Sequence, residues 1–465
     1  MFRWESRGCM KLEDRSKILE EAKKYKLKFE KQLCPISELN PNKPITFISV
    51  GGGELGDLAL TAAKRQLGGI NGGVRTIAFD VYDGFPGQDA ADYAKVFNMM
   101  DGDKLEENIR KFVPDPSEPH AIYLEVEKAD TRRVCKMGVE EGYKVMSTPY
   151  GPLICMDRHL TKLMFDKLNV PRVDWRYATS QQEIESIAKD FGLPVIAKPV
   201  MTSSGHGTAI VKSKEKLAHV YEHSLKHARG KGDEVIVEKY LPQLNIQGTE
   251  ITQIAIRHFD ENGKIVTSVA PPIEHKRPGA TYHESWLPST ISEKAKRTCQ
   301  ESVKKIAKYI GGLGVFALEL FVIDDIVYNN EVANRPHDTG MITRWMLNMD
   351  EGTMMLFSTL GLQLIPFDLK MSRPGYGVAH VILAENIPED KNYYVKGLNL
   401  NRVRTYIKNN GYDGDLWYFG KPMAYPHRRM GLAVGFHNYI LKARKIAEDI
   451  AHQTEKLITF DNRKN

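Results

Sequence analysis

The chain has 465 residues, of which 42% are hydrophobic and 27% charged, and its formal net charge is +6. This length predicts two or three domains with a large buried interior, and the composition excludes a disordered or fibrous protein. A positive charge that is small and evenly spread does not indicate nucleic-acid binding. The five cysteines lack metal-ligand spacing, the N-terminus lacks a signal-peptide pattern, and no apolar run is long enough for a membrane span. We therefore expect a cytoplasmic protein.

The order of apolar and polar segments predicts a multidomain protein that combines α/β and α+β parts. Residues 1–44 are rich in Lys and Glu and predict a helical appendage. Residues 45–149 alternate apolar strands with helical patterns, which indicates a Rossmann-like parallel sheet with helices on both faces. Residues 150–362 predict an α+β domain built on antiparallel strands, and residues 363–465 predict a smaller C-terminal cap.

A glycine loop, GGGELG, follows the first strand of the Rossmann-like region. Its Gly51, Gly53 and Gly56 fit the G-x-G-x-x-G pattern, and Asp80 ends the next strand, which on pattern alone indicates a nicotinamide-dependent oxidoreductase. Glu54 argues against that hypothesis, because a carboxylate at a helix N-terminus competes with pyrophosphate for the free N–H groups. The loop would then suit an amine or hydroxyl of a ligand.

Two segments of the middle region predict a nucleotide site. Lys198 ends an apolar strand and is followed by a Ser/Gly loop, which together indicate a phosphate clamp without the ending of a P-loop. Glu238 ends another apolar strand and Glu250 opens the next, so backbone groups at the first strand end could face an adenine and the Glu250 carboxylate could hold ribose hydroxyls. The alternatives are a surface hairpin and ordinary surface acids.

Glu319 and Glu331 lie in otherwise apolar β runs that a tight hairpin would bring side by side. An unpaired buried charge costs several kcal/mol on an order-of-magnitude view, and a cation between the two carboxylates removes that cost. Mg²⁺ prefers a few carboxylates together with ATP phosphate oxygens. The alternative is that the acids face solvent, although packing does not explain the polar cluster of Arg335, His337 and Asp338 downstream.

A basic group of Lys421, Arg428 and Arg429 lies near the C-terminus between apolar segments. Such a group can hold a substrate phosphate through point charge and bidentate hydrogen bonds. The alternative is a solvated, charged face.

These segments in this order resemble the ATP-grasp superfamily and, within it, the formate-dependent phosphoribosylglycinamide formyltransferases of purine biosynthesis. The likeness runs from about residue 46 to 450 and includes GGGELG, NMMDGD, KPVMTSSGHG, HESWLP, ALELFV and EVANRPHDTGM. It implies an ATP- and Mg²⁺-dependent carboxylate-amine ligase that converts formate to formyl phosphate and transfers the formyl group to the amine of 5-phosphoribosylglycinamide. It also implies small-molecule substrates, no nucleic acid or membrane partner, and a homodimer.

The resemblance implies a role for individual residues. The ATP site would comprise Arg158, Lys198, Ser203, Ser204, Gly205, His206, Gly207, Thr208, Glu238, Lys239, Tyr240, Leu241 and Glu250. The amine substrate would be bound by Glu54, Leu55, Glu127, Asp338, Lys421, Arg428 and Arg429. The metal ligands would be Glu319 and Glu331, and the catalytic residues Asp338, Arg335 and Lys198. This chain has His206 where the family has lysine. Two alternatives share the fold: a bicarbonate-dependent carboxylase of an aminoimidazole ribonucleotide, and a catalytically inactive binding module.

Overall fold

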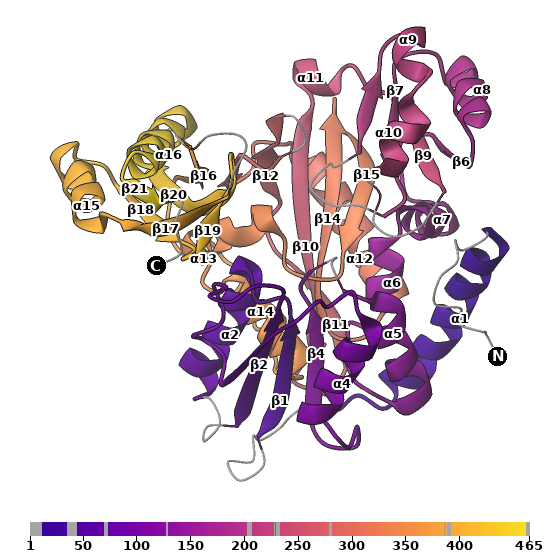
Figure 1. Ribbon diagram of the computed structural model, residues 1–465, viewed down its shortest axis with the longest axis horizontal. Coiled ribbons are helices and arrows are strands. Elements are labelled where there is room, and N and C mark those ends of the chain that lie inside the picture. Colours follow the sequence, from indigo (N-terminus) through magenta and orange to yellow (C-terminus); the bar gives the residue numbers. More distant parts are fainter. Residues whose placement is uncertain are drawn as a thin grey trace.

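The computed structural model describes residues 12–34, 44–68, 73–126, 129–201, 207–226, 228, 233–278, 281–385, 387 and 392–461. Figure 1 shows a long central sheet, with the N-terminal parallel sheet below it, a smaller sheet at its upper right and the C-terminal elements at the left. Among the described helices, none is both long and apolar enough to cross a membrane.

A parallel sheet ordered β3-β2-β1-β4-β5 forms the N-terminal part of the fold. Its apolar strands are covered on both faces, by α2 (Glu54–Leu67) in one buried cluster and by α4 (Gly102–Phe112) and α5 (Thr131–Lys136) in another. The predicted α/β architecture is confirmed. Because the strands are parallel, the carboxyl ends of β1, β2 and β4 share one edge of the sheet. The strands are β1 (Ile45–Val50), β2 (Val74–Asp80), β3 (Tyr93–Val96), β4 (His120–Leu124) and β5 (Val145–Met146).

A smaller antiparallel sheet, ordered β6-β9-β7-β8, lies at the upper right in Figure 1. Its apolar face packs against α8 and α10 in a separate buried cluster. Lys198 and Glu238 lie on neighbouring strands of this sheet, β7 and β9. The strands are β6 (Trp175–Ala178), β7 (Val195–Pro199), β8 (Ala209–Val211) and β9 (Val235–Lys239), and the helices are α8 (Gln181–Phe191), α9 (Lys214–Leu217) and α10 (Val220–Lys226).

The central sheet has the order β15-β14-β10-β12-β13-β16-β20-β18, with β11 paired to β10. It continues past residue 362, because β13 pairs with β16 of the C-terminal segment. Helix α12 packs against β10 and β14 in one buried cluster, and α14 contacts the same two strands. The strands are β10 (Thr249–Phe259), β11 (Ile265–Val269), β12 (Ile273–Lys276), β13 (Glu284–Leu287), β14 (Gly314–Ile323), β15 (Ile326–Ala333), β16 (Tyr376–Leu383), β18 (Gly414–Tyr418) and β20 (Arg429–His437).

Short helices and a small C-terminal sheet complete the fold. The sheet has the order β19-β17-β21, and α16 packs on β16 and β20. The remaining elements are η1 (Met137–Glu141), α6 (Gly151–Met156), α7 (Arg158–Leu168), α11 (Leu244–Gln247), α12 (Glu293–Ile310), η3 (Asp338–Ile342), α13 (Thr343–Met346), α14 (Glu351–Thr359), β17 (Tyr393–Leu398), α15 (Leu400–Asn409), β19 (Met423–Ala424), α16 (Ile440–Glu455) and β21 (Ile458–Asp461).

The N-terminal helix α1 (Leu12–Glu30) packs on the body of the protein. Its Ile18 and Leu19 are buried in the same cluster as α12. Arg15, 3% exposed, forms ion pairs with Asp157 (3.0 Å) and Glu234 (2.5 Å). Asp157 caps α7 and Glu234 immediately precedes β9, so this buried guanidinium ties α1 to the start of both elements.

Candidate active site

A cavity of about 910 Å³ lies where the three main sheets meet. Its wall includes the carboxyl ends of β1, β2 and β4, strands β7, β14 and β15, and the segment from Lys421 to Arg429. Most of the predicted site residues therefore share one cavity. Those that line it are Glu54, Leu55, Arg158, Lys198, Thr208, Lys239, Tyr240, Leu241, Glu250, Glu319, Glu331, Arg335, Asp338, Lys421, Arg428 and Arg429.

The two predicted metal ligands are directly opposite each other. Glu319 of β14 pairs in register with Glu331 of β15, and a register shift follows Glu319. Each carboxylate is matched by an arginine: Arg277 Nη2 lies 2.8 Å from Glu319, and Arg158 Nε lies 2.7 Å from Glu331. The hairpin therefore places two carboxylates at the cavity wall, as the sequence predicted, and arginines balance their charge.

Those arginines determine the ionisation of the pair. Burial alone would raise the pKa of Glu319, but Arg277 and His337 lower it well below its usual value. Burial opposes ionisation of Glu331 as well, and Arg158 and Lys198 bring its pKa below the ordinary range. Both carboxylates are thus anionic at neutral pH, which is the form that binds a hard cation.

Lys198 belongs to a buried charge cluster beneath the cavity. Its Nζ lies 2.7 Å from Glu238, and Lys162 Nζ lies 2.5 Å from the other oxygen of the same carboxylate. Burial would raise the pKa of Glu238, but the two ammonium groups lower it to about 2. Lys198 also donates to the side-chain oxygen of Asn330 (3.1 Å). Glu238 is 2% exposed and does not line the cavity, so its side chain positions the lysines.

The end of the cavity with the paired acids also contains Glu250, which lies 3.4 Å from His275 on β12. Burial raises the pKa of the Glu250 carboxyl to about 7; Arg277 opposes this rise and Glu319 adds to it. Residues 239–241 follow β9 along the same wall. Gly207 is buried beside the cavity-lining Thr208. The other predicted loop residues, Ser203, Ser204, Gly205 and His206, lie outside the described residues.

Acids and bases from distant parts of the chain meet at the other end of the cavity. Glu54, the first residue of α2, lies 3.0 Å from Lys421 and 3.8 Å from Arg429. Arg429 also pairs with Asp338 (2.8 Å). Burial opposes ionisation of Asp338, but His337, Arg277 and Arg429 hold its pKa well below the usual range. This end is therefore a network of ionised carboxylates and cations.

Cation–π contacts and hydrogen bonds hold the residues next to this network in place. Arg428 lies over the rings of Tyr82 and Tyr425, with its guanidinium carbon 5.3 and 5.4 Å from their centroids. The turn before η3 is held by Glu351, which accepts a hydrogen bond from the His337 N–H (2.9 Å). Arg335 also lines the cavity, and its Nη1 donates to the Pro336 carbonyl (2.9 Å).

Sequence reasoning did not identify every cavity residue. Glu127 lies outside the described residues, whereas Glu125, two positions earlier, lines the cavity. Arg277 and Lys162 were also missed. Arg277 follows His275 by two positions at the end of a strand, and this alternation could have placed both side chains on one face. Lys162 could not be found in this way, because its partner Glu238 comes from another element.

The loop GGGELG contributes differently from a dinucleotide fingerprint. Asp80 accepts hydrogen bonds from the N–H groups of Gly52 (3.0 Å) and Val81 (2.6 Å), so it fixes the loop. A Cβ on Gly52 would come within 2.2 Å of the Phe85 ring, which leaves no room for a larger residue. Glu54 at the start of α2 is paired with Lys421. These contacts support the interpretation in which the loop presents a carboxylate to the cavity.

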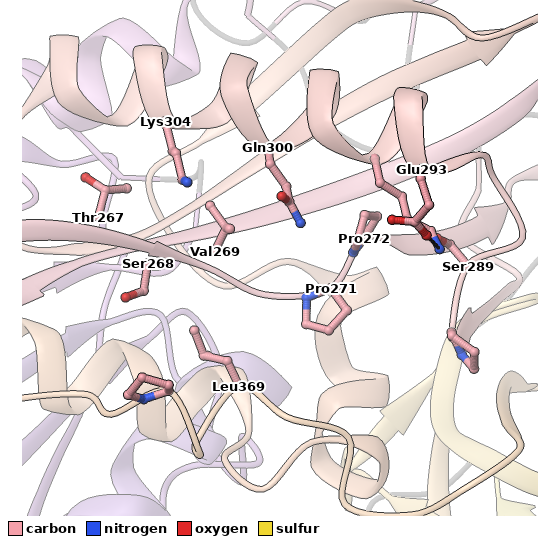
Figure 2. Close-up of a pocket in the computed structure, with 13 residues that line it drawn as sticks. Thr267, Ser268, Val269, Pro271, Pro272, Ser289, Glu293, Gln300, Lys304 and Leu369 are labelled. Carbon is pink, nitrogen blue, oxygen red and sulfur yellow. Dashed lines mark hydrogen bonds and ion pairs between the residues drawn. The ribbon is translucent and has the colours of Figure 1, made fainter.

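A second hollow, of about 550 Å³, is lined by residues of β11 and α12. Figure 2 shows Gln300 and Lys304 extending from α12 toward the strand with Thr267 and Val269. Among the described residues that line it, Glu293 is the one acid, and Lys296 lies 2.7 Å from it. None of the predicted site residues lies there, so we place the chemistry in the larger cavity.

Comparison with known proteins shows the family of the chain. Residues 163–351 match the model of the ATP-grasp domain. Two solved structures share the fold: an ADP complex of N5-carboxyaminoimidazole ribonucleotide synthetase (TM-score 0.72, 21% identity, 90% of this chain and 100% of that one) and glycinamide-RNase-transformylase T from Mycobacterium tuberculosis (TM-score 0.67, 22% identity, 88% and 99%). A formate-dependent phosphoribosylglycinamide formyltransferase from Sulfurisphaera tokodaii is 35% identical over 405 residues, which span 86% of this chain and 94% of that protein. The chain belongs to the family of formate-dependent phosphoribosylglycinamide formyltransferases.

Proposed function

We propose that this protein uses ATP and Mg²⁺ to join formate to the amine of 5-phosphoribosylglycinamide, with formyl phosphate as the intermediate. The observation that carries the proposal is the division of one cavity into two ends. The paired acids Glu319 and Glu331 lie at one end, and the ion-pair network of Glu54, Asp338 and Arg429 lies at the other. A reaction that activates one substrate and transfers it to a second needs both sites within one cavity.

The acid pair fits Mg²⁺. Carboxylate oxygens are hard ligands, and this ion typically uses one or two protein carboxylates and completes its shell with phosphate oxygens and water. Glu319 and Glu331 would hold the ion, which when bound neutralises phosphate charge during phosphoryl transfer.

The nucleotide would lie along β7, β9 and β15. Lys198 and Arg158 supply positive charge next to Glu331, and Lys198 is held in place by Glu238 and Asn330. In phosphoryl transfer, catalysis is mostly positioning and charge stabilisation, so cations fixed by buried partners suit the task. Tyr240, Leu241 and Glu250 would contact the adenosine, and the loop from Ser203 to Thr208 would cover the phosphates.

The acceptor would lie against the opposite network. Lys421, Arg428 and Arg429 offer point charge and bidentate donors to its phosphate. Glu54 and Asp338 are both anionic, because neighbouring cations outweigh the effect of burial on their pKa values. An anionic carboxylate accepts a hydrogen bond from an amine and so can orient it toward the acyl phosphate. Leu55, which lines the cavity, would contact the acceptor as well, and Glu127, which the resemblance assigns to it, lies outside the described residues.

The chemistry requires activation because the carboxylate oxygen of formate is a poor leaving group. Transfer of the γ-phosphoryl group to formate converts that oxygen into the bridging oxygen of an acyl phosphate, and the amine then displaces phosphate. Arg335, Lys198 and Asp338 would stabilise charge and hold the amine during these two steps. The sequence offers no convincing nucleophile-base pair, which fits a path without a covalent enzyme intermediate.

The direct test measures ADP production with each carboxylate and each amine acceptor, supplied separately and together. We expect turnover to depend on ATP, formate and 5-phosphoribosylglycinamide. Phosphate release with bicarbonate and aminoimidazole ribonucleotide, but not with formate, would instead establish the carboxylase alternative. Tight NADH binding without ATP binding would favour the oxidoreductase, and full activity of Glu319→Ala would favour a binding module.

We also propose a cytoplasmic location and a homodimer. The described cysteines Cys34, Cys135, Cys155 and Cys299 are free thiols, as expected in a reducing compartment. Light scattering of the purified full chain tests the dimer, with a mass near 53 kDa as the contrary result.

A further inference from the structure

We propose that Arg277 binds the carboxylate of the small acid substrate and so forms a subsite between the metal acids and the acceptor network. The inference rests on the proposed function, because it assigns the position of formate in that reaction. Arg277 was not among the residues that the sequence or the resemblance indicated.

The position of Arg277 follows from strand geometry. It lies one residue beyond the end of β12, two positions after His275, so both side chains project from the same face of the strand. His275 is buried, and Arg277 lines the cavity. The neighbouring Lys276 projects from the other face, toward Glu284 (3.7 Å).

Arg277 contacts both ends of the cavity. Its Nη2 lies 2.8 Å from Glu319, a proposed metal ligand, and 3.4 Å from Asp338, a proposed acceptor residue. The carboxylate substrate must reach the γ-phosphate first and the acceptor amine second, so it has to lie between these two groups. Arg277 is therefore a cation at the position where the reaction requires the small anion.

Four other cavity cations pair with acids at one end of the cavity. Arg158 and Lys198 are held by Glu331 and Glu238 at the nucleotide end. Lys421 and Arg429 contact Glu54 at the acceptor end. Among the described residues, ion pairs to both Glu319 and Asp338 are made by Arg277 and by His337. His337 has both ring nitrogens engaged, by Glu319 (2.8 Å) and by the Thr339 hydroxyl (2.9 Å).

Arg277 retains donor capacity. Within the described part of the chain, its buried Nε has no hydrogen-bond acceptor. A guanidinium offers parallel N–H groups that match the two oxygens of a carboxylate, which an ammonium cannot do. The fork of Nε and Nη2 can therefore bind the substrate when the substrate displaces Glu319 from Nη2, whose other N–H stays near Asp338.

The proposed contact persists through both chemical steps. In the first, one formate oxygen forms a bond to the γ-phosphorus, and the bond from that phosphorus to the bridging oxygen breaks, so that ADP leaves with the electron pair. In the second, the amine nitrogen forms a bond to the formyl carbon and the bond from that carbon to the phosphate oxygen breaks, so that phosphate leaves with the electron pair and takes up the proton that the amine loses. Arg277 holds the oxygen that is not phosphorylated and stabilises its negative charge when the amine adds.

The test compares Arg277→Gln and Arg277→Lys with wild type and with Lys276→Gln as the matched control. Lys276 carries the same charge on the same strand, but its side chain is 59% exposed and faces away from the cavity. We measure KM and kcat for formate, ATP and acceptor separately, and ATP binding by equilibrium titration without formate. Thermal unfolding shows which variants are folded.

We expect Arg277→Gln to raise KM for formate by about 10- to 100-fold, the range for losing a charge-assisted hydrogen bond, and to change ATP binding by less than about threefold. Arg277→Lys should keep the fold and charge yet still raise KM for formate, because it lacks the fork. Wild-type KM for formate in both variants would overturn the inference, as would equal rises for formate and ATP. If wild-type protein forms no ADP with formate, the proposed function fails, and the inference with it.

Discussion

The two ends of the cavity are built in different ways. At the nucleotide end, Glu319 and Glu331 lie on adjacent strands of one hairpin, and Lys198 and Glu238 lie on neighbouring strands of one small sheet. At the acceptor end, Glu54 begins the first helix after β1, whereas Arg429 begins a strand near the C-terminus. The two paired acids of the first end come from one hairpin, although remote segments supply Arg158 and Lys162, whereas the second end forms only when the whole chain has folded.

Because of this difference, we expect the two ends to respond differently to substitution. A carboxylate on a paired strand keeps its position through backbone hydrogen bonds, so its substitution should affect chemistry more than structure. An ion pair between remote segments links those segments as well as binding a ligand, so its loss should affect both. Substitutions at each end test this contrast.

The largest effect is expected at the paired acids. Glu319→Gln or Glu331→Gln removes half of the proposed anionic site, and we expect kcat to fall by at least about 1,000-fold, since charge stabilisation by a bound metal contributes several kcal/mol. ADP production measures this. Glu301→Gln, an exposed acid on α12, is the control and should keep wild-type activity. Near-normal kcat in both cavity variants would remove the metal site from the proposal.

A second prediction concerns the link between α1 and the nucleotide end. Arg15→Met leaves Asp157 and Glu234 buried without their cation, and breaking such a pair costs about 3 to 5 kcal/mol of unfolding free energy. Because these acids begin α7 and β9, KM for ATP should rise while KM for the acceptor stays near the wild-type value. Denaturant titration and kinetics measure the two effects.

The control for that variant is Lys24→Met on the exposed side of α1. It should leave both stability and KM for ATP unchanged. If Arg15→Met raised KM for ATP and for the acceptor alike, α1 would serve the fold in general and the contrast between the two ends would be lost.

The third prediction addresses the acceptor end. Arg429→Gln removes one of the cationic partners of Asp338 and of Glu54, and we expect KM for the acceptor to rise by about 10- to 100-fold, as for a lost charge-assisted contact. KM for ATP should stay within about threefold. Because these ion pairs join remote segments, their loss should also lower the unfolding temperature. An unchanged KM for the acceptor would place the acceptor elsewhere in the cavity.

The fold was predictable where periodicity is strong and local. The run ITFISV predicted a strand and GGGELG its turn into a helix, and both are present as β1 and α2. Pairing between β13 and β16 was not predictable, because nothing in either segment specifies a partner so far away along the chain. The burial of Arg15 in α1 was also not predictable. Nothing in a Lys- and Glu-rich helix indicates that one of its charged residues pairs with two buried acids from other segments.

A site residue was predictable from the sequence where a charged side chain interrupted or ended an apolar strand. Glu319 and Glu331 were conspicuous as acids in apolar strands, and Lys198 as a cation at the end of one. Arg277 did not stand out in this way, because it follows a short strand at a turn. Only the packing of β12 against β10 and η3 brings it to Glu319 and Asp338.

The smallest effect is expected from Glu250. Burial raises its folded-state pKa from 4.5 to about 7, so between these values the folded protein holds a proton that the unfolded chain has lost. Stability should therefore fall as pH rises through this interval. Because the side chain is 27% exposed, we expect about 1 to 2 kcal/mol, less than the full shift would give. Glu250→Gln cannot titrate, so its unfolding free energy relative to wild type should increase by that amount between pH 4.5 and pH 8.

The same variant separates stability from binding at the nucleotide end. If the Glu250 carboxylate accepts hydrogen bonds from ribose hydroxyls, wild-type affinity for ATP should weaken as pH falls below about 7, where the group becomes protonated. In Glu250→Gln that pH dependence should disappear. The variant could instead gain stability at high pH and keep the wild-type pH profile for ATP binding. That result would show that Glu250 is an acid of the cavity wall without a ribose contact, and that the ribose contact belongs to the backbone of residues 239–241.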